Sequence, residues 1–551
     1  MLIALIAAAV VLVSAPNNSD YSLFDGEYVV VVNGEKRTEV TEENFEKYFS
    51  YDLVKSNVDK HIWMDEEVGI ITITNKDGII RLDKNTSDEI LIKEQKIYIK
   101  QIFLEKTYNC IFQYIEENNV TIILNDEMNA GEIVSQIEEL CVRTSPTVKA
   151  PRVKVISSEV GKVVAHAVEN SKTDWIKVIT LTGETGYVRR SEVNFKGNKN
   201  YKGEVVGFNK DMPGTAQTGE TLGSKFKFKK INMIWEAVYS RNPDVTKIGD
   251  MQGLNVIAPT WFELLDETGS IANKADRDYV DWAHNRGYYV WGTIVSVTDY
   301  DMTSKMLHNY EVRSSYIEQI VGYALEYELD GINIDFEYMY EEDKMLFTQF
   351  ARELSTLCHI NGLIVSCDVT ILSNSPKWSL CYDRKSLADS LDFICVMFYD
   401  QHSAGSKQAG SVAQLSWTKS ALELLLGQIP NDKLILSMPF YTRLWEERES
   451  ENGDFSIKSK AIGMEEAGAW VEEKGLKPEW DEDSGQFYTQ YEEEVDGENV
   501  IYRLWIEDKN SIKKRVELVN SYNLAGCSAW RRGFETGDIW AVIDETLKES
   551  G

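Results

Sequence analysis

Residues 329–338 read Leu-Asp-Gly-Ile-Asn-Ile-Asp-Phe-Glu-Tyr, and this stretch decides both the fold and the place of the candidate site. The Asp-Gly pair predicts the entry to a short buried β-strand whose apolar side chains occupy every second position. Asn333, Asp335 and Glu337 occupy the positions between them and share the other face. An acidic face is costly to bury unless its groups are hydrogen-bonded or functional. The alternative is an acidic edge strand facing solvent, which the apolar partner face and the helical pattern that follows disfavour.

From residue 228 to residue 551 short apolar runs alternate with longer helical patterns. The pattern at 346–357 has helical spacing, and the Asn-Gly pair at 361–362 is typical of a C-terminal cap. The eight candidate strands cover residues 231–238, 254–259, 288–295, 331–336, 363–369, 393–398, 434–438 and 525–529. Eight strands separated by helices predict a (β/α)8 TIM barrel of the α/β class, with its site at the carboxyl ends of the strands. A long acidic segment at about 446–500 separates the last two strands and exceeds a simple loop.

Four motifs at the predicted strand ends resemble those of family 18 glycoside hydrolases, the chitinase-like enzymes. Residues 330–337 are similar to the family's Asp-Gly-x-x-x-Asp-x-Glu signature, and residues 397–400, Met-Phe-Tyr-Asp, to its Met-x-Tyr-Asp motif. Residues 438–445 resemble its Pro-x-Tyr-x-Arg run, and residues 527–530, Cys-Ser-Ala-Trp, the run that supplies its aromatic floor. One departure is Asn333, where many members have Asp. An amide cannot ionise, so pKa coupling between that position and Asp335 is weakened or absent.

The resemblance implies retaining hydrolysis that the substrate's own 2-acetamido group assists. Glu337 is then the acid that protonates the leaving oxygen and later the base for water, which requires a pKa raised by burial or by a neighbouring negative charge. Asp335 hydrogen-bonds the acetamido N–H and stabilises the oxazolinium-like intermediate, and Tyr399 donates its hydroxyl to the acetamido oxygen. No metal and no cofactor are implied, because the acetamido group replaces an external nucleophile.

The resemblance also implies a set of substrate-binding residues: Asn333, Met397, Asp400, Tyr441, Arg443 and Trp530. Trp530 would stack beneath the sugar, and Asn333 would support Asp335 from below. Plainer roles stay open for several of these side chains. Met397 can simply pack, Arg443 can pair with the acidic insertion, and Trp530 can be a core aromatic at the barrel rim. Tyr399 can likewise be an ordinary strand-end tyrosine. The family also implies that the acidic segment at about 446–500 is an α+β insertion that forms one wall of the cleft.

Composition narrows the possible partners. The chain has 58 Lys and Arg against 89 Asp and Glu, a formal net charge of −31. That charge repels phosphates and anionic membranes, so a nucleic acid partner is disfavoured, whereas an N-acetylglucosamine-containing glycan is compatible with it. The 7 cysteines are scattered and form no CxxC pair, so we interpret them as small core residues, not as a disulfide framework or a zinc site.

Four segments precede the barrel domain, which is assigned to residues 228–551. Residues 1–22 begin with an apolar run at 1–15 and fit a secretory signal or an uncleaved anchor, with a buried strand as the alternative, so an extracellular or envelope-associated protein is expected. Residues 23–148 predict a small α+β domain whose strand rhythm is similar to the N-terminal domain of copper amine oxidases. Residues 149–196 resemble a bacterial SH3-like β-barrel, which would attach the protein to the cell wall or act as a spacer. Residues 197–227 predict a linker.

Together these features predict an exported glycoside hydrolase that cleaves β-1,4 bonds next to N-acetylglucosamine. An SH3-like domain ahead of the barrel resembles bacterial wall-lytic and spore-cortex-lytic members, so peptidoglycan is the preferred substrate and chitin or its oligomers the alternative. The rival from another class is a chitinase-like lectin that binds glycans without cleaving them. Such proteins usually lose the acid, whereas this chain keeps Asp335 and Glu337. A third possibility is a wall-anchoring protein whose barrel is incidental.

Overall fold

The chain forms two compact units, Met1–Met212 and Pro213–Gly551. The computed structural model describes residues 28–32, 39–108, 110–115, 120–125, 132–157, 159–167, 174–182, 184–196, 229–296, 298–449, 455–495 and 498–548. The expected signal or anchor at 1–22 and the expected linker at 197–227 lie outside these residues. Among the described residues, no helix has the length and hydrophobicity needed to span a bilayer.

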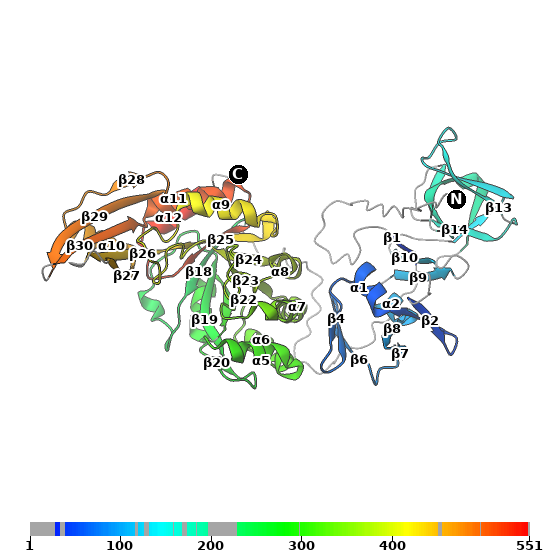
Figure 1. Cartoon of the computed structure of the whole chain (residues 1–551), viewed down its shortest axis with the longest axis horizontal. Coiled ribbons are helices and arrows are strands. Elements are labelled where there is room, and N and C mark those ends of the chain that lie inside the picture. The colour runs from blue at the N-terminus through cyan, green and yellow to red at the C-terminus, as the bar shows by residue number, and fades with distance from the viewer. Residues whose placement is uncertain are drawn as a thin grey trace. The chain divides into compact units, whose positions relative to one another are not determined.

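The second unit is built on a closed barrel of parallel strands (Figure 1). The first strand, β18, pairs in parallel with both β19 and β31, which closes the sheet on itself. The eight predicted strands and the TIM barrel are therefore confirmed. In chain order they are β18 (Ile231–Glu236), β19 (Val256–Leu264), β21 (Tyr289–Val295), β22 (Gly331–Asp335), β23 (Ile364–Thr370), β24 (Phe393–Met397), β25 (Leu434–Pro439) and β31 (Gly526–Trp530). A short strand, β20 (Ile271–Asn273), pairs antiparallel with the end of β19.

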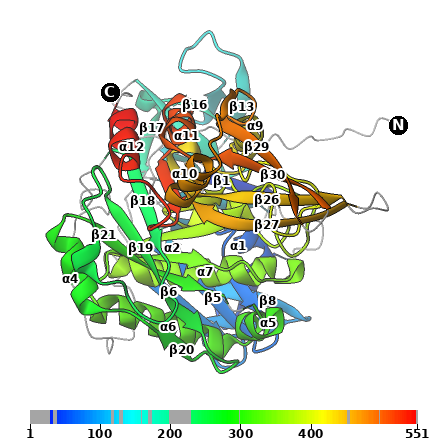
Figure 2. The same ribbon diagram turned by 90° about the vertical axis from the view of Figure 1, so that its left-hand side faces the viewer.

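Helices follow the strands and cover the outside of the barrel (Figures 1 and 2). The helix after β22 ends as its sequence predicts, because the Gly362 backbone has a φ of 72°, the left-handed conformation that glycine adopts readily. The Gly362 N–H donates to the His359 carbonyl, and the Leu363 N–H donates to the Cys358 carbonyl. The helices are α4 (Arg277–Asn285), α5 (Tyr300–His308), α6 (Tyr310–Glu326), α7 (Lys344–Ile360), α8 (Arg384–Ser390), α9 (Leu415–Leu425), α11 (Lys509–Ser521) and α12 (Ile539–Lys548).

The alternation in the deciding stretch separates two cores. Ile332, Ile334 and Phe336 are fully buried in the layer between the strands and the helices. The Phe336 ring stacks on Phe350 of α7 at 5.4 Å between ring centroids, and full burial of such a side chain is worth about 1.5–3 kcal/mol. Asn333, from the same strand, is fully buried on the other side, inside the barrel. The strand therefore delivers its polar face to the barrel interior, as its sequence predicts.

An α+β insertion separates β25 from α11, which confirms that prediction. It is wider than the acidic segment at 446–500, because its first strand begins at Tyr441 and its last ends at Ile506. Its five antiparallel strands run in the order β27-β26-β30-β29-β28, and the helix α10 (Met464–Glu473) packs on one face through Ala467, against Ile462 and Leu504. The strands are β26 (Tyr441–Glu449), β27 (Phe455–Gly463), β28 (Glu479–Asp481), β29 (Gln486–Val495) and β30 (Glu498–Ile506).

Within the first unit, small sheets precede residue 132. Helices α1 (Tyr51–Asn57) and α2 (Gln101–Tyr108) share a hydrophobic core with strands of these sheets, for example through Leu53, Leu104 and Phe49. The sheets are β1-β10-β9, β2-β3-β8-β7 and β4-β5-β6. Their strands are β1 (Tyr28–Val32), β2 (Val40–Glu43), β3 (Glu46–Ser50), β4 (Trp63–Asp65), β5 (Ile70–Asn75), β6 (Gly78–Asp83), β7 (Ile90–Lys93), β8 (Lys96–Lys100), β9 (Cys110–Ile115) and β10 (Val120–Asn125).

A further antiparallel sheet of this unit runs in the order β13-β12-β16-β15-β14-β11-β17. It has its own small core, which includes Ile176, Val178 and Val188 from the segments that suggested an SH3-like domain. The sheet also takes in two strands that precede residue 149, and its assignment to the SH3 class stays a prediction. Its strands are β11 (Glu132–Ser135), β12 (Glu139–Arg143), β13 (Arg152–Ser157), β14 (Val163–Ala167), β15 (Trp175–Thr180), β16 (Thr185–Arg189) and β17 (Val193–Lys196).

Candidate active site

A fully hydrogen-bonded amide lies at the centre of the barrel interior. Asn333 Nδ2 donates to Asp368 Oδ1 at 2.8 Å and to Ser366 Oγ at 3.0 Å. Its Oδ1 accepts from Trp235 Nε1 at 2.9 Å and from Thr293 Oγ1 at 3.1 Å. All four hydrogen-bonding positions of the amide are therefore used. A carboxylate at position 333 could not donate a hydrogen bond to Asp368. Asn333 therefore suits a site in which the neighbouring strand, β23, carries the acidic residue Asp368.

Asp335 is the last residue of β22 and lies two positions after Asn333, so both side chains point to the same side of the strand. Its Oδ1 is buried and accepts no hydrogen bond from the described part of the protein. Burial, and then the negative charges of Glu337 and Asp368, raise the pKa of Asp335 well above its usual value. Burying a hydrogen-bond acceptor without a partner costs free energy. Such an acceptor is typical of a group that binds a ligand.

Glu337 follows the strand, where the backbone is fixed from two sides. Ser296 Oγ accepts from the backbone N–H groups of Glu337 at 3.1 Å and of Tyr338 at 3.2 Å. On the other side Tyr382 donates its hydroxyl to the Phe336 carbonyl at 2.8 Å. Burial, and then the negative charge of Asp400, raise the pKa of Glu337 above its usual value. Glu337 therefore keeps its proton to a higher pH than an exposed glutamate does, as a general acid requires.

The end of β24 and the start of β26 bring three further predicted residues together. Met397, Tyr399 and Tyr441 are buried in one small cluster. Tyr441 donates its hydroxyl to Asp400 Oδ1 at 2.6 Å. Burial is the main cause that raises the pKa of Tyr399 well above its usual value, so its hydroxyl stays a hydrogen-bond donor. Asp400 has a φ of 59°, a conformation that Asp and Asn tolerate better than most residues.

Trp530 and Arg443 complete the predicted set. The Trp530 ring lies 6.2 Å from the Trp235 ring, centroid to centroid, at the end of β31. Arg443 donates from Nη1 to Ser459 Oγ of the insertion at 3.0 Å, and its Nε is buried without a partner in the described part of the chain. Arg443 thus contacts the insertion through a hydroxyl group. The barrel mouth therefore gathers side chains from β22, β24, β26 and β31.

Sequence reasoning missed Asp368 on β23. The Asp368 side chain is only 2% exposed, and burial raises its pKa to about 8 although the hydrogen bond from Asn333 lowers it. The signal that could have found it is the alternation of Ser366, Asp368 and Thr370 with apolar residues in the strand at 364–370. This is the same period of two that marked the strand at 331–335.

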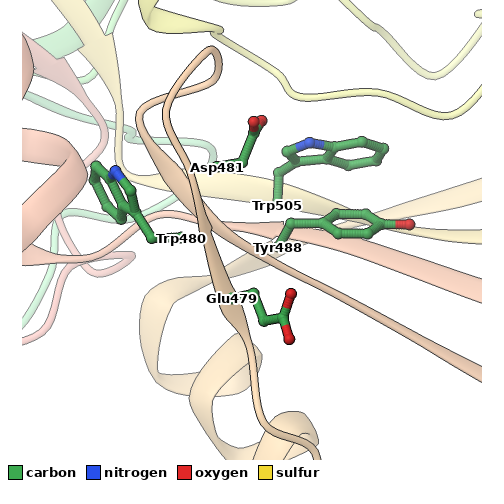
Figure 3. A pocket seen from close by; sticks show the side chains of 5 residues that line it. All are labelled: Glu479, Trp480, Asp481, Tyr488 and Trp505. Carbon is green, nitrogen blue, oxygen red and sulfur yellow. The ribbon is translucent and has the colours of Figure 1, made fainter.

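A row of side chains crosses the insertion sheet away from α10. Thr442 Oγ1 of β26 donates to the Trp505 carbonyl, which places Trp505 beside the strand that carries Arg443. Trp505 pairs in register with Tyr488, and Tyr488 pairs with Glu479. The Trp505 and Tyr488 rings lie 4.8 Å apart, centroid to centroid, and they line an open pocket of about 290 Å³ together with Glu479, Trp480 and Asp481. Figure 3 shows Trp505, Tyr488 and Glu479 on one side of the strands and Trp480 on the other.

Residues 285–535 match the sequence profile described as "Glycosyl hydrolases family 18". The match covers the barrel strands from β21 to β31 and the buried carboxyl groups at their ends. The chain carries a glycoside hydrolase family 18 domain. The protein is accordingly a glycoside hydrolase.

Curated relatives share this domain at low identity. The chain is 25% identical over 304 residues to the "Uncharacterized glycosylase YvbX" of Bacillus subtilis (strain 168), covering 54% of this chain and 85% of that protein. It is 25% identical over 244 residues to the "Cortical fragment-lytic enzyme" of the same organism, covering 44% of this chain and 55% of that enzyme. The chain thus spans about half the length of the cortical enzyme.

Solved structures of the family confirm the fold. A chitinase from Chromobacterium violaceum ATCC 12472 superposes with a TM-score of 0.51 at 20% identity, over 58% of this chain and 99% of that structure. At this identity the similarity establishes the barrel fold and nothing about the substrate.

Proposed function

We propose that the protein cleaves β-1,4 bonds next to N-acetylglucosamine, with retention of configuration and with assistance from the substrate's 2-acetamido group. The observation that carries the proposal is the pair Asp335 and Glu337. Asp335 presents a buried carboxylate oxygen that has no hydrogen-bond partner among the residues that the structure describes, and Glu337 follows two residues later with a raised pKa. The buried Oδ1 of Asp335 would accept a hydrogen bond from an acetamido N–H of the substrate. The glycosidic oxygen would take the proton from the Glu337 carboxyl group.

The reaction would proceed in two balanced steps. In the first, the acetamido carbonyl oxygen forms a bond to the anomeric carbon, the bond from that carbon to the leaving oxygen breaks, and the leaving oxygen takes the proton of Glu337. Asp335 accepts the acetamido N–H and offsets the positive charge of the cyclic intermediate. In the second, water attacks the anomeric carbon from the side of the departed group, gives its proton to Glu337 and reopens the ring. Two inversions at one carbon give net retention.

The tyrosine and tryptophan side chains would hold the sugar for this reaction. Tyr399 keeps its proton, so its hydroxyl can donate to the acetamido oxygen and turn it toward the anomeric carbon. Trp530, at the end of β31, offers an aromatic face to the apolar face of the ring. Asp400, Tyr441 and Arg443 line the side toward the insertion.

Peptidoglycan is the preferred substrate, and chitin oligomers are the alternative. The name of the cortical fragment-lytic relative favours a peptidoglycan-derived glycan, and the predicted SH3-like domain would hold the enzyme at the wall. The row from Arg443 to Trp505 and Tyr488 suits a long substrate, since aromatic side chains bind sugar faces. The apolar run at residues 1–15 supports export.

Product release tests this proposal. Purified peptidoglycan and chitin oligomers are incubated with the wild type, with Glu337→Gln and with the matched control Glu342→Gln, whose side chain is exposed. We expect the wild type and the control to release fragments with N-acetylglucosamine at the reducing end. The rate of Glu337→Gln should be lower than that of the wild type by a factor of about 10²–10⁴. Glycan binding by all three proteins without any release would contradict the enzyme and favour a lectin.

A further inference from the structure

A second buried carboxyl lies inside the barrel beside the proposed catalytic pair. Asp368 is held there by the 2.8 Å hydrogen bond from Asn333 Nδ2, and the Cys395 thiol and the Trp235 indole are within hydrogen-bonding reach. Neither the sequence motif nor the proposed steps give this acid a role. Burying a carboxyl group costs free energy, so a carboxyl buried beside a site is a candidate for a functional role.

The strand register places Asp368 level with Asp335. In the parallel pair β22 and β23, Asn333 is opposite Ser366 and Ile334 is opposite Cys367. The next residues on the two strands are Asp335 and Asp368. Neighbouring strands lie about 4.8 Å apart. Two carboxyl groups carried at facing positions of neighbouring strands in a buried site repel each other strongly when both are ionised.

In the described part of the chain, the groups that act most strongly on Asp368 include no cation. They are Asp335 and Glu337 from β22 and its end, Cys367 on its own strand, Cys395 from β24 and Tyr399 beyond it. These groups are neutral or negative. The charges that act on Asp335 are both negative, those of Glu337 and Asp368. Mutual repulsion among the carboxyl groups therefore determines which of them holds a proton.

We propose that Asp368 is a positioning residue of the reaction: as the second buried carboxyl, fixed by Asn333, it sets the charge that Asp335 carries when the acetamido group binds. The proposal rests on the proposed function and deepens it. A neutral Asp368 lets Asp335 carry the negative charge that stabilises the cyclic cation. Asn333 is the amide that this arrangement needs, because it donates to Asp368 and adds no third charge.

The proposal predicts how the pH profile moves when the carboxyl is removed. Asp368 raises the pKa of Asp335 and interacts in the same sense with Glu337. In Asp368→Asn this repulsion disappears, so the pKa values of both groups fall. The rate needs Asp335 ionised and Glu337 protonated, so both limbs of the pH profile move to lower pH. We expect a shift of roughly 1 pH unit.

The test compares pH profiles of kcat/KM, measured with an aryl glycoside of an N-acetylglucosamine oligomer, for the full chain and four variants. They are Asp368→Asn, Asn333→Asp, the double variant Asn333→Asp/Asp368→Asn, and the control Ser366→Ala, which removes another acceptor of Asn333 without removing a charge. We expect Asp368→Asn to move the profile to lower pH, Asn333→Asp to move it to higher pH, and the exchange to bring it back toward the wild type. Ser366→Ala lowers the rate at most, without moving the profile.

A uniform loss of rate in Asp368→Asn, with the profile in place, would mean that Asp368 is only structural and would overturn the proposal. A second measurement keeps the proposal testable if a variant does not fold. In wild-type protein labelled with ¹³C at the Asp carboxyl carbon, an NMR titration should find a carboxyl that titrates near pH 8. Absence of any Asp carboxyl titrating above pH 6 would also overturn it. This titration needs no turnover, so it separates a failure of this proposal from a failure of the proposed function.

Discussion

At the scale of the residue, the proposed reaction depends on the proton that Glu337 holds. Burial and the negative charge of Asp400 both disfavour its ionised form. As the proposed acid, Glu337 would therefore be active below its raised pKa, and this activity would be lost as the pH rises through that value. Its backbone is held by Ser296 and Tyr382, so its position does not depend on the substrate.

Removing the Asp400 charge should lower the pKa of Glu337. In Asp400→Asn the alkaline limb of kcat/KM is expected at a pH lower by roughly 1 unit, because one of the two causes of the raised pKa is gone. Asn tolerates the φ of 59° and still accepts the Tyr441 hydrogen bond, so the fold should persist. The measurement is the pH dependence of kcat/KM. Asp432→Asn, at an exposed site at the other end of the barrel, is the control, and equal alkaline limbs in both variants would contradict the assignment of Glu337 as the acid.

The site residues were predictable where they lie in one contiguous motif. The shared face of Asp335 and Glu337 follows from alternation in ten residues, whereas the roles proposed for them and for Tyr399 rest on the family resemblance of two short motifs. Asp368 was not predicted, because its strand at 363–369 reads as an apolar core run and its polar face contains only one acid. The partners of Asn333 come from three other strands, and such contacts depend on register and barrel closure. No local pattern encodes them.

At the scale of the element, the insertion sheet would extend the proposed site. Its first strand, β26, carries Tyr441 and Arg443, and the row continues to Trp505 on β30 and Tyr488 on β29. The eight barrel strands were predictable from their apolar runs, whereas the insertion began earlier and ended later than its acidic segment. Its outer strands have mixed composition, for example Gln-Phe-Tyr-Thr-Gln at 486–490, so charge alone did not mark their limits.

Trp505→Ala should affect long substrates only. Loss of one aromatic contact is worth about 0.5–1.5 kcal/mol, so kcat/KM on long glycan chains should fall roughly threefold to tenfold. Turnover of a short aryl glycoside should stay unchanged, since Trp505 lies on β30 of the insertion and not on the barrel strand that carries Asp335. Trp470→Ala is the matched control, because Trp470 lies on α10, which packs on the other face of the sheet and does not line this pocket. Equal losses on short and long substrates would contradict a role in binding the outer part of the chain.

At the scale of the whole molecule, two compact units divide the work that we propose. The barrel unit holds every proposed catalytic group, and the seven-stranded sheet of the other unit is the predicted wall-binding module. With a formal net charge of −31, the protein is poorly suited to bind anionic polymers through charge alone. Wall attachment would therefore need a specific module.

A chain limited to residues 213–551 should keep its kcat/KM on soluble oligomers and should lose binding to insoluble peptidoglycan. The reason is that the barrel unit has its own core and contains the whole site. Sedimentation with purified sacculi measures the binding, and a soluble aryl glycoside measures the activity. Equal sedimentation of the short and full chains would contradict a wall-binding role for the first unit.

The most direct test of the central claim is the dependence of rate on the nucleophilicity of the acetamido group. Aryl glycosides that carry acetamido, monofluoroacetamido or trifluoroacetamido at carbon 2 are compared with the wild-type enzyme. If the substrate's carbonyl oxygen attacks the anomeric carbon, kcat/KM falls with each fluorine, because fluorine withdraws electrons from that oxygen. A rate that does not change along the series would contradict substrate assistance and would require a nucleophile from the protein.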